Sequence, residues 1–131
     1  MKVKIDTKEK FKIIHPEEPE LTANMTENLQ EIFQNCLTDY PHDVILNLSA
    51  VTSLSEEAAN LLSDMQQHFY ENQYSFVLCE LKEEVEESLD QIGLLELLNT
   101  TPTESEAWDI VQMEELEREL LGDDDIENNN N

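Results

Sequence analysis

Residues 44–69 read VILNLSAVTSLSEEAANLLSDMQQHF, and this stretch decides the fold. Its first five residues form a short, mostly apolar run that is typical of a buried strand. A small polar segment at 52–55 follows and is suited to capping a helix. Apolar residues then recur at helical spacing from Ala58 to Phe69. The stretch therefore predicts a buried strand, a short turn and a helix.

The loop after this strand is the first place to look for function. In open α/β sheets, binding sites tend to lie at the carboxyl ends of the strands. The alternative interpretation is a plain structural strand–helix unit, which is common in α/β domains.

The length and composition of the chain fit one packed domain. It has 131 residues, of which 39% are hydrophobic, enough to bury a core. No apolar run approaches the roughly 18 residues that a membrane span needs, and the N-terminus lacks the hydrophobic segment of a signal peptide. We therefore expect a cytoplasmic protein without direct membrane insertion.

The net charge is −24, and it is distributed unevenly. Five of the seven basic residues lie in the first twelve positions: Lys2, Lys4, Lys8, Lys10 and Lys12. Such an acidic chain repels phosphate backbones and anionic lipid headgroups, which argues against nucleic-acid and membrane partners. It favours a protein partner with a basic surface.

The sequence contains no recognisable catalytic constellation. Two glycines cannot build a phosphate-binding loop, and the three histidines follow no metal-ligand spacing. We expect Cys36 and Cys79 to be buried free thiols and Trp108 to pack the last helix on the domain. The chain is therefore predicted to be no enzyme and to need no metal or cofactor.

The remaining elements follow from hydrophobic periodicity and from start and stop signals. We expect strands at 2–6, 11–15, 44–48 and 75–79, helices starting near 21–23, 55 and 82, an edge strand near 98–100 and a last helix from 103 to Gly122. Thr22 or Asn24 can cap the first helix, Ser55 the second, and Gly93 ends the third. The order β-β-α-β-α-β-α-(β)-α predicts a single α/β domain with a mixed sheet of four to five strands and about four helices.

The last residues differ in composition from the rest. Residues 122–131 are acidic and rich in asparagine, with one apolar residue. We expect them to form a disordered tail behind a domain of residues 1–121.

Several segments resemble, in order, those of one family. Leu21-Thr22-Ala23 resembles the segment before that family's first helix, and VILNLSAV at 44–51 resembles its strand VILDLSxV. FVL at 76–78 and the leucine–glycine pattern at 89–97 match further segments. The family is the STAS domain, found in bacterial anti-anti-sigma factors and in the C-terminal regions of sulphate transporters. The resemblance covers nearly all of the chain except the tail and implies a STAS-like fold.

The resemblance also identifies a regulatory position. In the family, the loop after this strand ends in Asp-Ser-Ser-Gly, and the second serine is phosphorylated by a partner kinase that is itself an anti-sigma factor. The aligned residues here are Ser55, Glu56, Glu57 and Ala58, and all four differ from that pattern. Thr22 also replaces an acidic residue that is common at the other edge of the family's partner surface. The resemblance therefore implies a protein that has lost the usual phospho-acceptor serine.

Glu57 places a permanent carboxylate where the family has its phosphate. The first turn of a helix favours an anion, although a carboxylate carries about one charge and a phosphate about 1.5 to 2. One hypothesis is that the domain is held permanently in a state similar to the phosphorylated one, or that phosphorylation no longer regulates it. The alternative is that Glu56 and Glu57 only stabilise the helix, by about 0.3 to 1 kcal/mol each. The remaining candidates for a phosphorylation site at a different position of the same loop are Ser53, Ser55 and Thr52.

The function implied by the resemblance is bacterial signalling in transcription regulation. We expect a non-catalytic, anti-sigma factor antagonist-like protein, a monomer or weak dimer, whose partner is an anti-sigma kinase or a related signalling protein. The predicted partner surface comprises Thr22, Asn24, Ser53, Ser55, Glu56, Glu57 and Asn60. The alternatives are a soluble STAS subunit of a transporter assembly and a small-ligand-binding STAS domain.

Overall fold

Strand β4 (Asp43–Asn47) is the centre of the fold, because all five of its residues are buried. It pairs in parallel with β2 (Phe11–Pro16) on one side and with β6 (Phe76–Cys79) on the other. A strand that is paired at both edges and covered on both faces has no solvent-facing side chains. This is why the segment reads as a continuous apolar run, and the buried strand predicted at 44–48 is confirmed one residue earlier.

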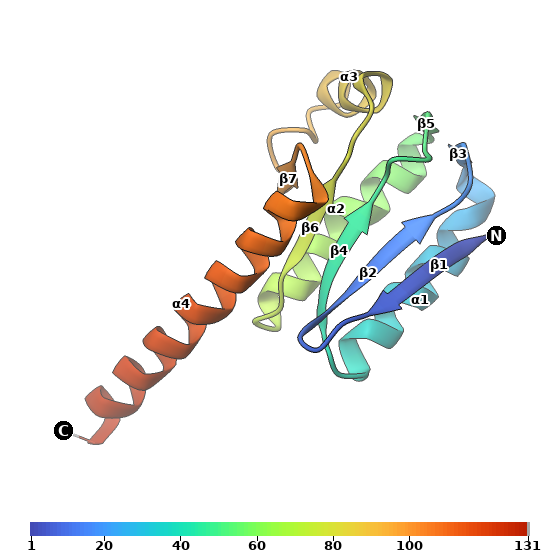
Figure 1. Cartoon of the computed structure of the whole chain (residues 1–131). Helices are drawn as coiled ribbons and strands as arrows, with labels where there is room; N and C mark the ends of the chain where they lie inside the picture. Colours follow the sequence, from blue (N-terminus) through green and yellow to red (C-terminus); the bar gives the residue numbers. More distant parts are fainter. Residues whose placement is uncertain (131) are drawn as a thin grey trace.

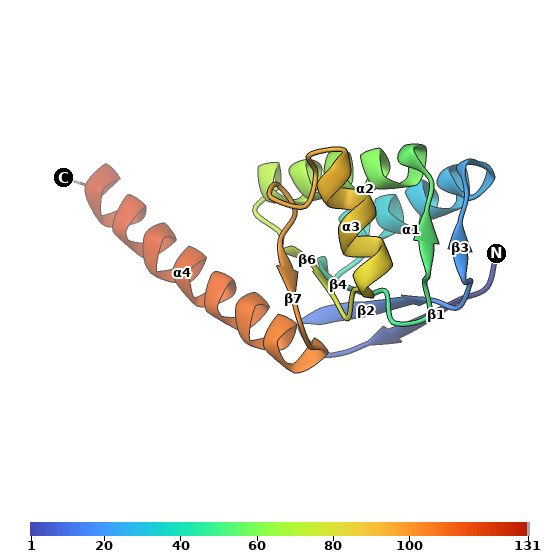
Figure 2. The same cartoon turned by 90° about the horizontal axis from the view of Figure 1, so that it is seen from above.

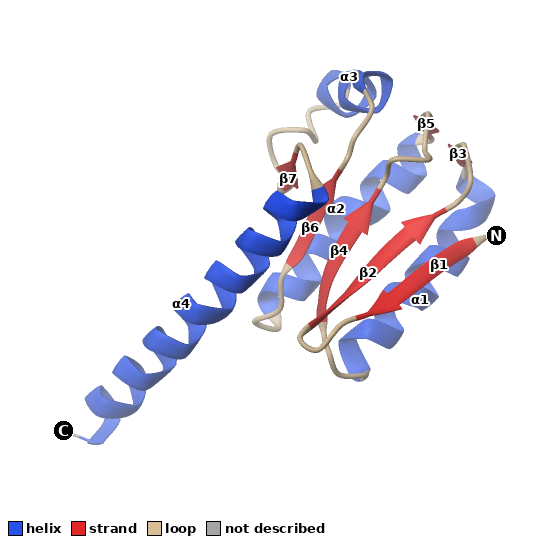
Figure 3. Cartoon of the chain, in the orientation of Figure 1, coloured by secondary structure: helices blue, strands red, loops and turns tan. Residues whose placement is uncertain are grey.

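The computed structural model describes the backbone of residues 1–130 and the side chains of residues 1–121. Its main sheet has five strands in the order β1-β2-β4-β6-β7 (Figure 3). The outer strands are β1 (Val3–Thr7), antiparallel to β2, and β7 (Thr100–Thr101), parallel to β6. The predicted mixed sheet is therefore confirmed.

A second, two-stranded ladder was not predicted. It joins β3 (Glu20–Leu21) to β5 (Ser53–Leu54) in parallel. The sequence pattern placed residues 53–54 in a polar loop and Leu21 at the start of the first helix, since two residues are too few to show any periodicity.

The helices lie on both sides of the sheet. They are the short 3-10 helix η1 (Ala23–Met25) and the α-helices α1 (Thr26–Thr38), α2 (Glu56–Glu71), α3 (Glu83–Gln91) and α4 (Glu104–Asn130). Figures 1 and 2 show α1, α2 and α3 on one side of the sheet and α4 on the other. The predicted number of about four helices is confirmed by α1 to α4.

The side chains of β4 alternate between two hydrophobic cores. Val44 and Leu46 belong to the larger core, which lies under α1 and α2. Ile45 belongs to the smaller core, where Ala107 and Val111 of α4 pack on the sheet. The burial of β4 therefore depends on α4 as well as on the helices of the other face.

Helix α4 is fixed to the sheet at its N-terminal end, as predicted. The ring of Trp108 meets the ring of Phe11 edge to face, with centroids 4.8 Å apart. The helix backbone continues past Gly122, where the sequence predicted its end, because one glycine in a helix costs only about 1 kcal/mol. The division into a domain of residues 1–121 and a tail stays a prediction, and Asn131 lies outside the described residues.

Both cysteines are buried free thiols, as predicted. Burial raises the pKa of Cys36. Burial, with Glu104 and Glu80 nearby, raises the pKa of Cys79 to about 12. Both therefore stay protonated and unreactive at neutral pH.

A buried polar cluster joins α4 to the amino ends of β4 and β6. The carboxylate of Asp43, only 2% exposed, accepts a hydrogen bond of 2.7 Å from the backbone N–H of Ser75. Arg118 of α4 lies with Nη1 3.8 Å from that carboxylate and donates to Glu115 at 3.0 Å and to the Ser75 hydroxyl at 2.5 Å. The Ser75 hydroxyl in turn donates to Glu114 at 2.6 Å.

The pKa of Asp43 reflects this environment. Burial, together with the neighbouring Glu115, raises the pKa of Asp43 to about 7, although the Ser75 N–H and Arg118 act in the opposite direction. An acid whose pKa is higher in the folded state binds its proton more tightly when folded. Its contribution to stability is therefore greatest at low pH and is lost as the pH rises through the window from about 4 to about 7.

We expect the substitution Asp43→Asn to flatten the pH dependence of stability. Between pH 5 and pH 8, the free energy of unfolding of the wild-type protein should fall by about 1 to 3 kcal/mol relative to that of the variant. Urea denaturation at a series of pH values measures this difference. The matched control is Asp64→Asn at an exposed position of α2, which should follow the wild type. Parallel curves for the wild type and Asp43→Asn would contradict the assignment.

Candidate functional site

Two loops at the carboxyl ends of β2 and β4 are held together by backbone hydrogen bonds. The carbonyl of Pro19 accepts from the N–H groups of Thr52 and Ser53, at 2.7 and 3.2 Å, and the carbonyl of Leu21 accepts from Ser55 at 2.8 Å. The Thr52 hydroxyl adds a bond of 2.9 Å to the Pro19 carbonyl. These bonds form the β3–β5 ladder and fix the segment that leads into η1 against the segment that leads into α2.

Ser55 starts helix α2 as the sequence predicted. Its backbone is extended, with φ −72° and ψ 161°, and its hydroxyl accepts from the N–H of Ala58 at 3.0 Å. Glu56 and Glu57 follow in the first turn, and both side chains are exposed. Two carboxylates thus lie where the free N–H groups of the helix favour negative charge.

The structure brings the predicted partner-surface residues together from two segments. Ser53, Glu56, Glu57 and Asn60 are exposed on β5 and the first two turns of α2, with Ser55 half-buried between them. Helix η1 packs against α2, so the half-buried Thr22 and the exposed Asn24 lie beside that group. The juxtaposition was predicted, and the binding role of these residues stays a prediction.

The predicted cap of the first helix is wrong. Thr22 holds the N-cap position of η1, but its side chain makes no capping bond. Helix α1 begins at Thr26 after Met25, whose side chain cannot cap. The Thr26 hydroxyl instead donates to the Ala23 carbonyl at 2.8 Å. The chain enters α1 through a tight 3-10 turn, which leaves the side chains of Thr22 and Asn24 available at the surface.

A small groove beside the start of α2 was missed by the sequence analysis. It has a volume of about 160 Å³ and lies between the first turns of α2 and the end of α3. Its lining includes Leu54, Ser88 and Ile92, and Ile92 is 40% exposed although its spacing placed it on the buried face of α3. Gly93, with φ +74°, ends α3 at this point as predicted, and the turn leaves Ile92 at the rim of the groove.

The first turns of the two helices near the groove are acidic. Glu56, which lines the groove, and Glu57 lie in the first turn of α2, and Glu83, Glu84 and Glu86 lie in the first turn of α3. Carboxylates near a small apolar patch fit a partner surface with basic and apolar side chains.

Polar side-chain contacts stabilise the start of the loop that connects β4 to α2. Asn47, at the end of β4, accepts from the N–H of Ser49 at 2.9 Å and donates to Glu104 at 3.1 Å. The Ser49 hydroxyl lies 3.1 Å from Nε2 of His15. Asn47 thus holds the backbone of Ser49 and links β4 to α4, and His15 contacts the Ser49 side chain, so both residues have a structural role.

Within the described residues, no group of three or more His, Cys, Asp or Glu side chains is arranged to hold a metal ion. Among residues 1–130, no helix combines the length and apolar character needed to cross a membrane.

Comparison with known proteins gave one family and a set of similar structures. The family model for the STAS domain matches residues 2–107. A search of curated proteins found no match.

Three similar structures illustrate the range of the fold. A Thermotoga maritima protein, provisionally described as an anti-sigma factor antagonist, has a TM-score of 0.76 and 21% identity over 84% of this chain and 94% of its own. RsbS of Moorella thermoacetica, with a serine-to-glutamate substitution, has a TM-score of 0.71 and 19% identity over 86% of this chain and 96% of its own. The murine anion transporter Slc26a9 has a TM-score of 0.69 and 16% identity over 82% of this chain but only 18% of its own. At such identities the likeness shows the fold alone.

The helix cap at Ser55 can be tested directly. We expect Ser55→Ala to lower the free energy of unfolding by about 1 kcal/mol, because the N–H of Ala58 loses its acceptor. Ser53→Ala removes the same hydroxyl from an exposed position two residues earlier and should cost less than about 0.5 kcal/mol. Chemical denaturation compares the two variants. Equal effects would show that the cap contributes nothing to stability.

Proposed function

Because the chain belongs to the STAS domain family, we propose that it is a non-catalytic protein-interaction module of the anti-sigma factor antagonist kind. Its partner would be an anti-sigma kinase or a related signalling protein. The partner surface would be the one formed by the start of α2, the adjoining η1 segment and the groove at the end of α3.

The observation that supports this proposal is the set of backbone hydrogen bonds that joins the loop before η1 to the loop before α2. The bonds from Thr52, Ser53 and Ser55 to the carbonyls of Pro19 and Leu21 hold the two halves of the surface in one arrangement. A surface that is already ordered before binding loses little conformational entropy when the partner docks. Rigid loops at the carboxyl end of a parallel sheet are therefore suited to recognition.

Glu57 gives the proposed surface a fixed charge. By the family resemblance it stands at the position of the phosphorylated serine, on the exposed first turn of α2. Its carboxylate supplies about one negative charge, against about 1.5 to 2 for a phosphate. We infer that this surface is held in a state that approaches the phosphorylated one. The similar RsbS structure, which itself carries a glutamate in place of a serine, supports glutamate as a substitution that the fold accommodates.

The alternatives concern the partner and not the fold. A soluble subunit of a transporter assembly would use the same fold, which Slc26a9 shares. A small-ligand-binding domain would need a pocket near the loops, and the groove there has only about 160 Å³, below the size of usual ligand sites. The geometry therefore favours a protein partner.

Binding through the start of α2 is tested by charge reversal. We expect Glu57→Lys to abolish capture of a kinase or sigma-pathway protein from native lysate, because the positive charge repels a basic partner surface. Glu71→Lys is the matched control, since it makes the same charge change at the opposite end of α2. Mass spectrometry identifies the captured proteins. Recovery of the same proteins by both variants would contradict the proposed surface, and capture of membrane transport components would favour the transporter alternative.

The fixed charge is tested by restoring a hydroxyl. If Glu57 mimics the phosphate, Glu57→Ser should change the affinity for the captured kinase at least several-fold, and the introduced serine should be phosphorylated in the presence of ATP. Glu71→Ser serves as the control and should do neither. A Glu57→Ser protein with unchanged binding and no phosphorylation would leave Glu56 and Glu57 as stabilisers of the first helical turn only.

A further inference from the structure

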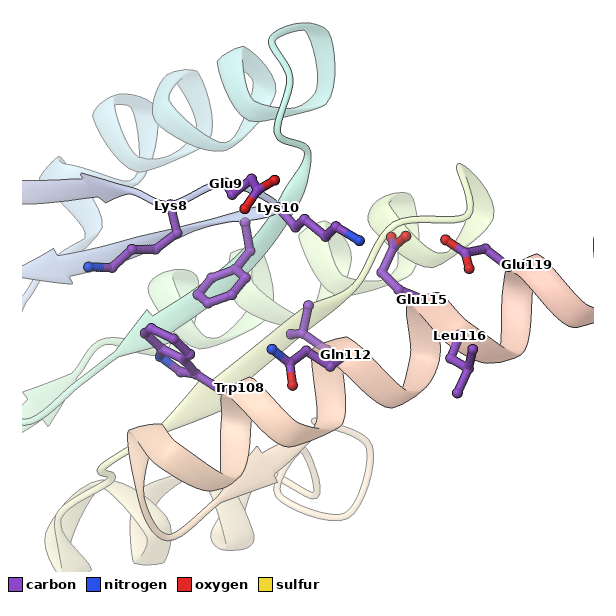
Figure 4. A pocket seen from close by; sticks show the side chains of 10 residues that line it. Lys8, Glu9, Lys10, Trp108, Gln112, Glu115, Leu116 and Glu119 are labelled. Atoms are coloured by element: carbon purple, nitrogen blue, oxygen red, sulfur yellow. The ribbon is translucent and has the colours of Figure 1, made fainter.

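A second hollow lies on the other face of the molecule, between the β1–β2 hairpin and α4 (Figure 4). Its volume is about 500 Å³. The floor is apolar and includes Phe11, Trp108 and Val111, and Leu116 lies at the edge on α4. We call it the α4 groove. It is larger than the groove beside the start of α2. The two hollows lie on opposite sides of the sheet, because α2 covers one face and α4 the other (Figure 2).

The two rims of the α4 groove carry opposite charges. The hairpin lines one rim with Lys8, Glu9 and Lys10, so that positive charge is in excess there, and Glu115 and Glu119 of α4 line the other rim (Figure 4). Lys8 also lies over the ring of Trp108, with Nζ 5.8 Å from the ring centroid. An occupant of this groove therefore needs an apolar face with acidic side chains toward the hairpin.

Helix α4 itself has such a face. Met113, Leu116 and Leu120 are 58%, 56% and 57% exposed, and their spacing of three and four residues places them on one stripe of the helix. Between residues 104 and 121, α4 carries seven acidic residues and one arginine. Within the described chain, the stripe stays uncovered, which is unusual for three large apolar side chains on one helix face.

Groove and stripe lie next to each other and share one residue. Leu116 lines the α4 groove and is also the middle residue of the stripe. A surface that carries both a groove and a helix face that fits it is self-complementary. About a two-fold axis, the stripe of each copy can lie in the groove of the other copy at the same time.

We propose that two copies of this chain associate about a two-fold axis through Leu116. Helix α4 of each copy lies antiparallel to α4 of the other, with its stripe of Met113, Leu116 and Leu120 seated in the α4 groove of the other copy. The acidic flanks of each α4 then meet Lys8 and Lys10 of the opposite hairpin. This association leaves the start of α2 uncovered and does not depend on the proposed function.

The net charge sets the strength of this contact. Each copy carries −24, so two copies repel each other at long range while the apolar stripe holds them at short range. Salt screens the long-range repulsion and leaves burial of apolar surface in place. The dimer should therefore become stronger when the salt concentration rises from about 50 mM to about 500 mM.

Sedimentation equilibrium of the full chain tests the proposal. We expect a monomer–dimer equilibrium for the wild type, and Leu116→Lys should raise its dissociation constant at least tenfold. Leu97→Lys makes the same substitution at a leucine that is 63% exposed outside α4 and should leave the dissociation constant unchanged. Circular dichroism checks that both variants stay folded. A wild type that stays monomeric up to about 1 mM, or a dimer that Leu116→Lys leaves intact, would overturn the proposal.

A second pair of variants tests the part played by the hairpin. Lys8→Glu with Lys10→Glu should weaken the dimer clearly more than Lys2→Glu with Lys4→Glu, which changes the net charge equally but lies outside the α4 groove. Equal weakening by both pairs would show general repulsion and overturn the proposed contact. A larger loss for the groove pair would locate the acidic flank of α4 at the hairpin.

Discussion

Burial of β4 on both faces is the constraint on which the rest of the structure depends. Its two edges are paired with β2 and β6, and its side chains divide between two cores. Helices must therefore cover both faces of the sheet, and α4 is as necessary as α1 and α2. The same burial fixes where the strand ends, and so where the loop before α2 emerges. The position of this loop follows from the core and not from the loop's own sequence.

The sequence predicted those parts of the structure that local patterns specify. The buried run at 44–48 and the cap at Ser55 were recognisable because burial on two faces and an N-cap hydroxyl each leave a distinct local signature. The β3–β5 ladder, the 3-10 turn at Ala23–Met25 and the groove beside Ile92 were not predicted. Each depends on segments that meet only after folding, and two or three residues carry no period that could reveal them.

For the candidate site, the family resemblance indicated residues that the structure brings side by side, but it did not indicate what joins them; their binding role stays a prediction. Thr22 or Asn24 was predicted to cap the first helix, yet the chain enters α1 through the 3-10 helix η1, and neither helix has a side-chain capping bond. The polar cluster of Asp43, Ser75 and Arg118 lies at the opposite end of the sheet. It could not be found from the sequence, because 75 residues separate Asp43 from Arg118 along the chain. One end of the sheet thus fastens α4, and the other end carries the loops of the candidate site.

Opposite charges are mixed at the amino end of the parallel strands, where Lys8 and Lys10 line the same hollow as Glu115. At the carboxyl end, Glu56, Glu57 and the glutamates of α3 gather in the first turns of two helices. A basic partner would be attracted most strongly toward those two helix ends. More of its encounters would then begin close to the start of α2, so that a larger share of collisions leads to docking.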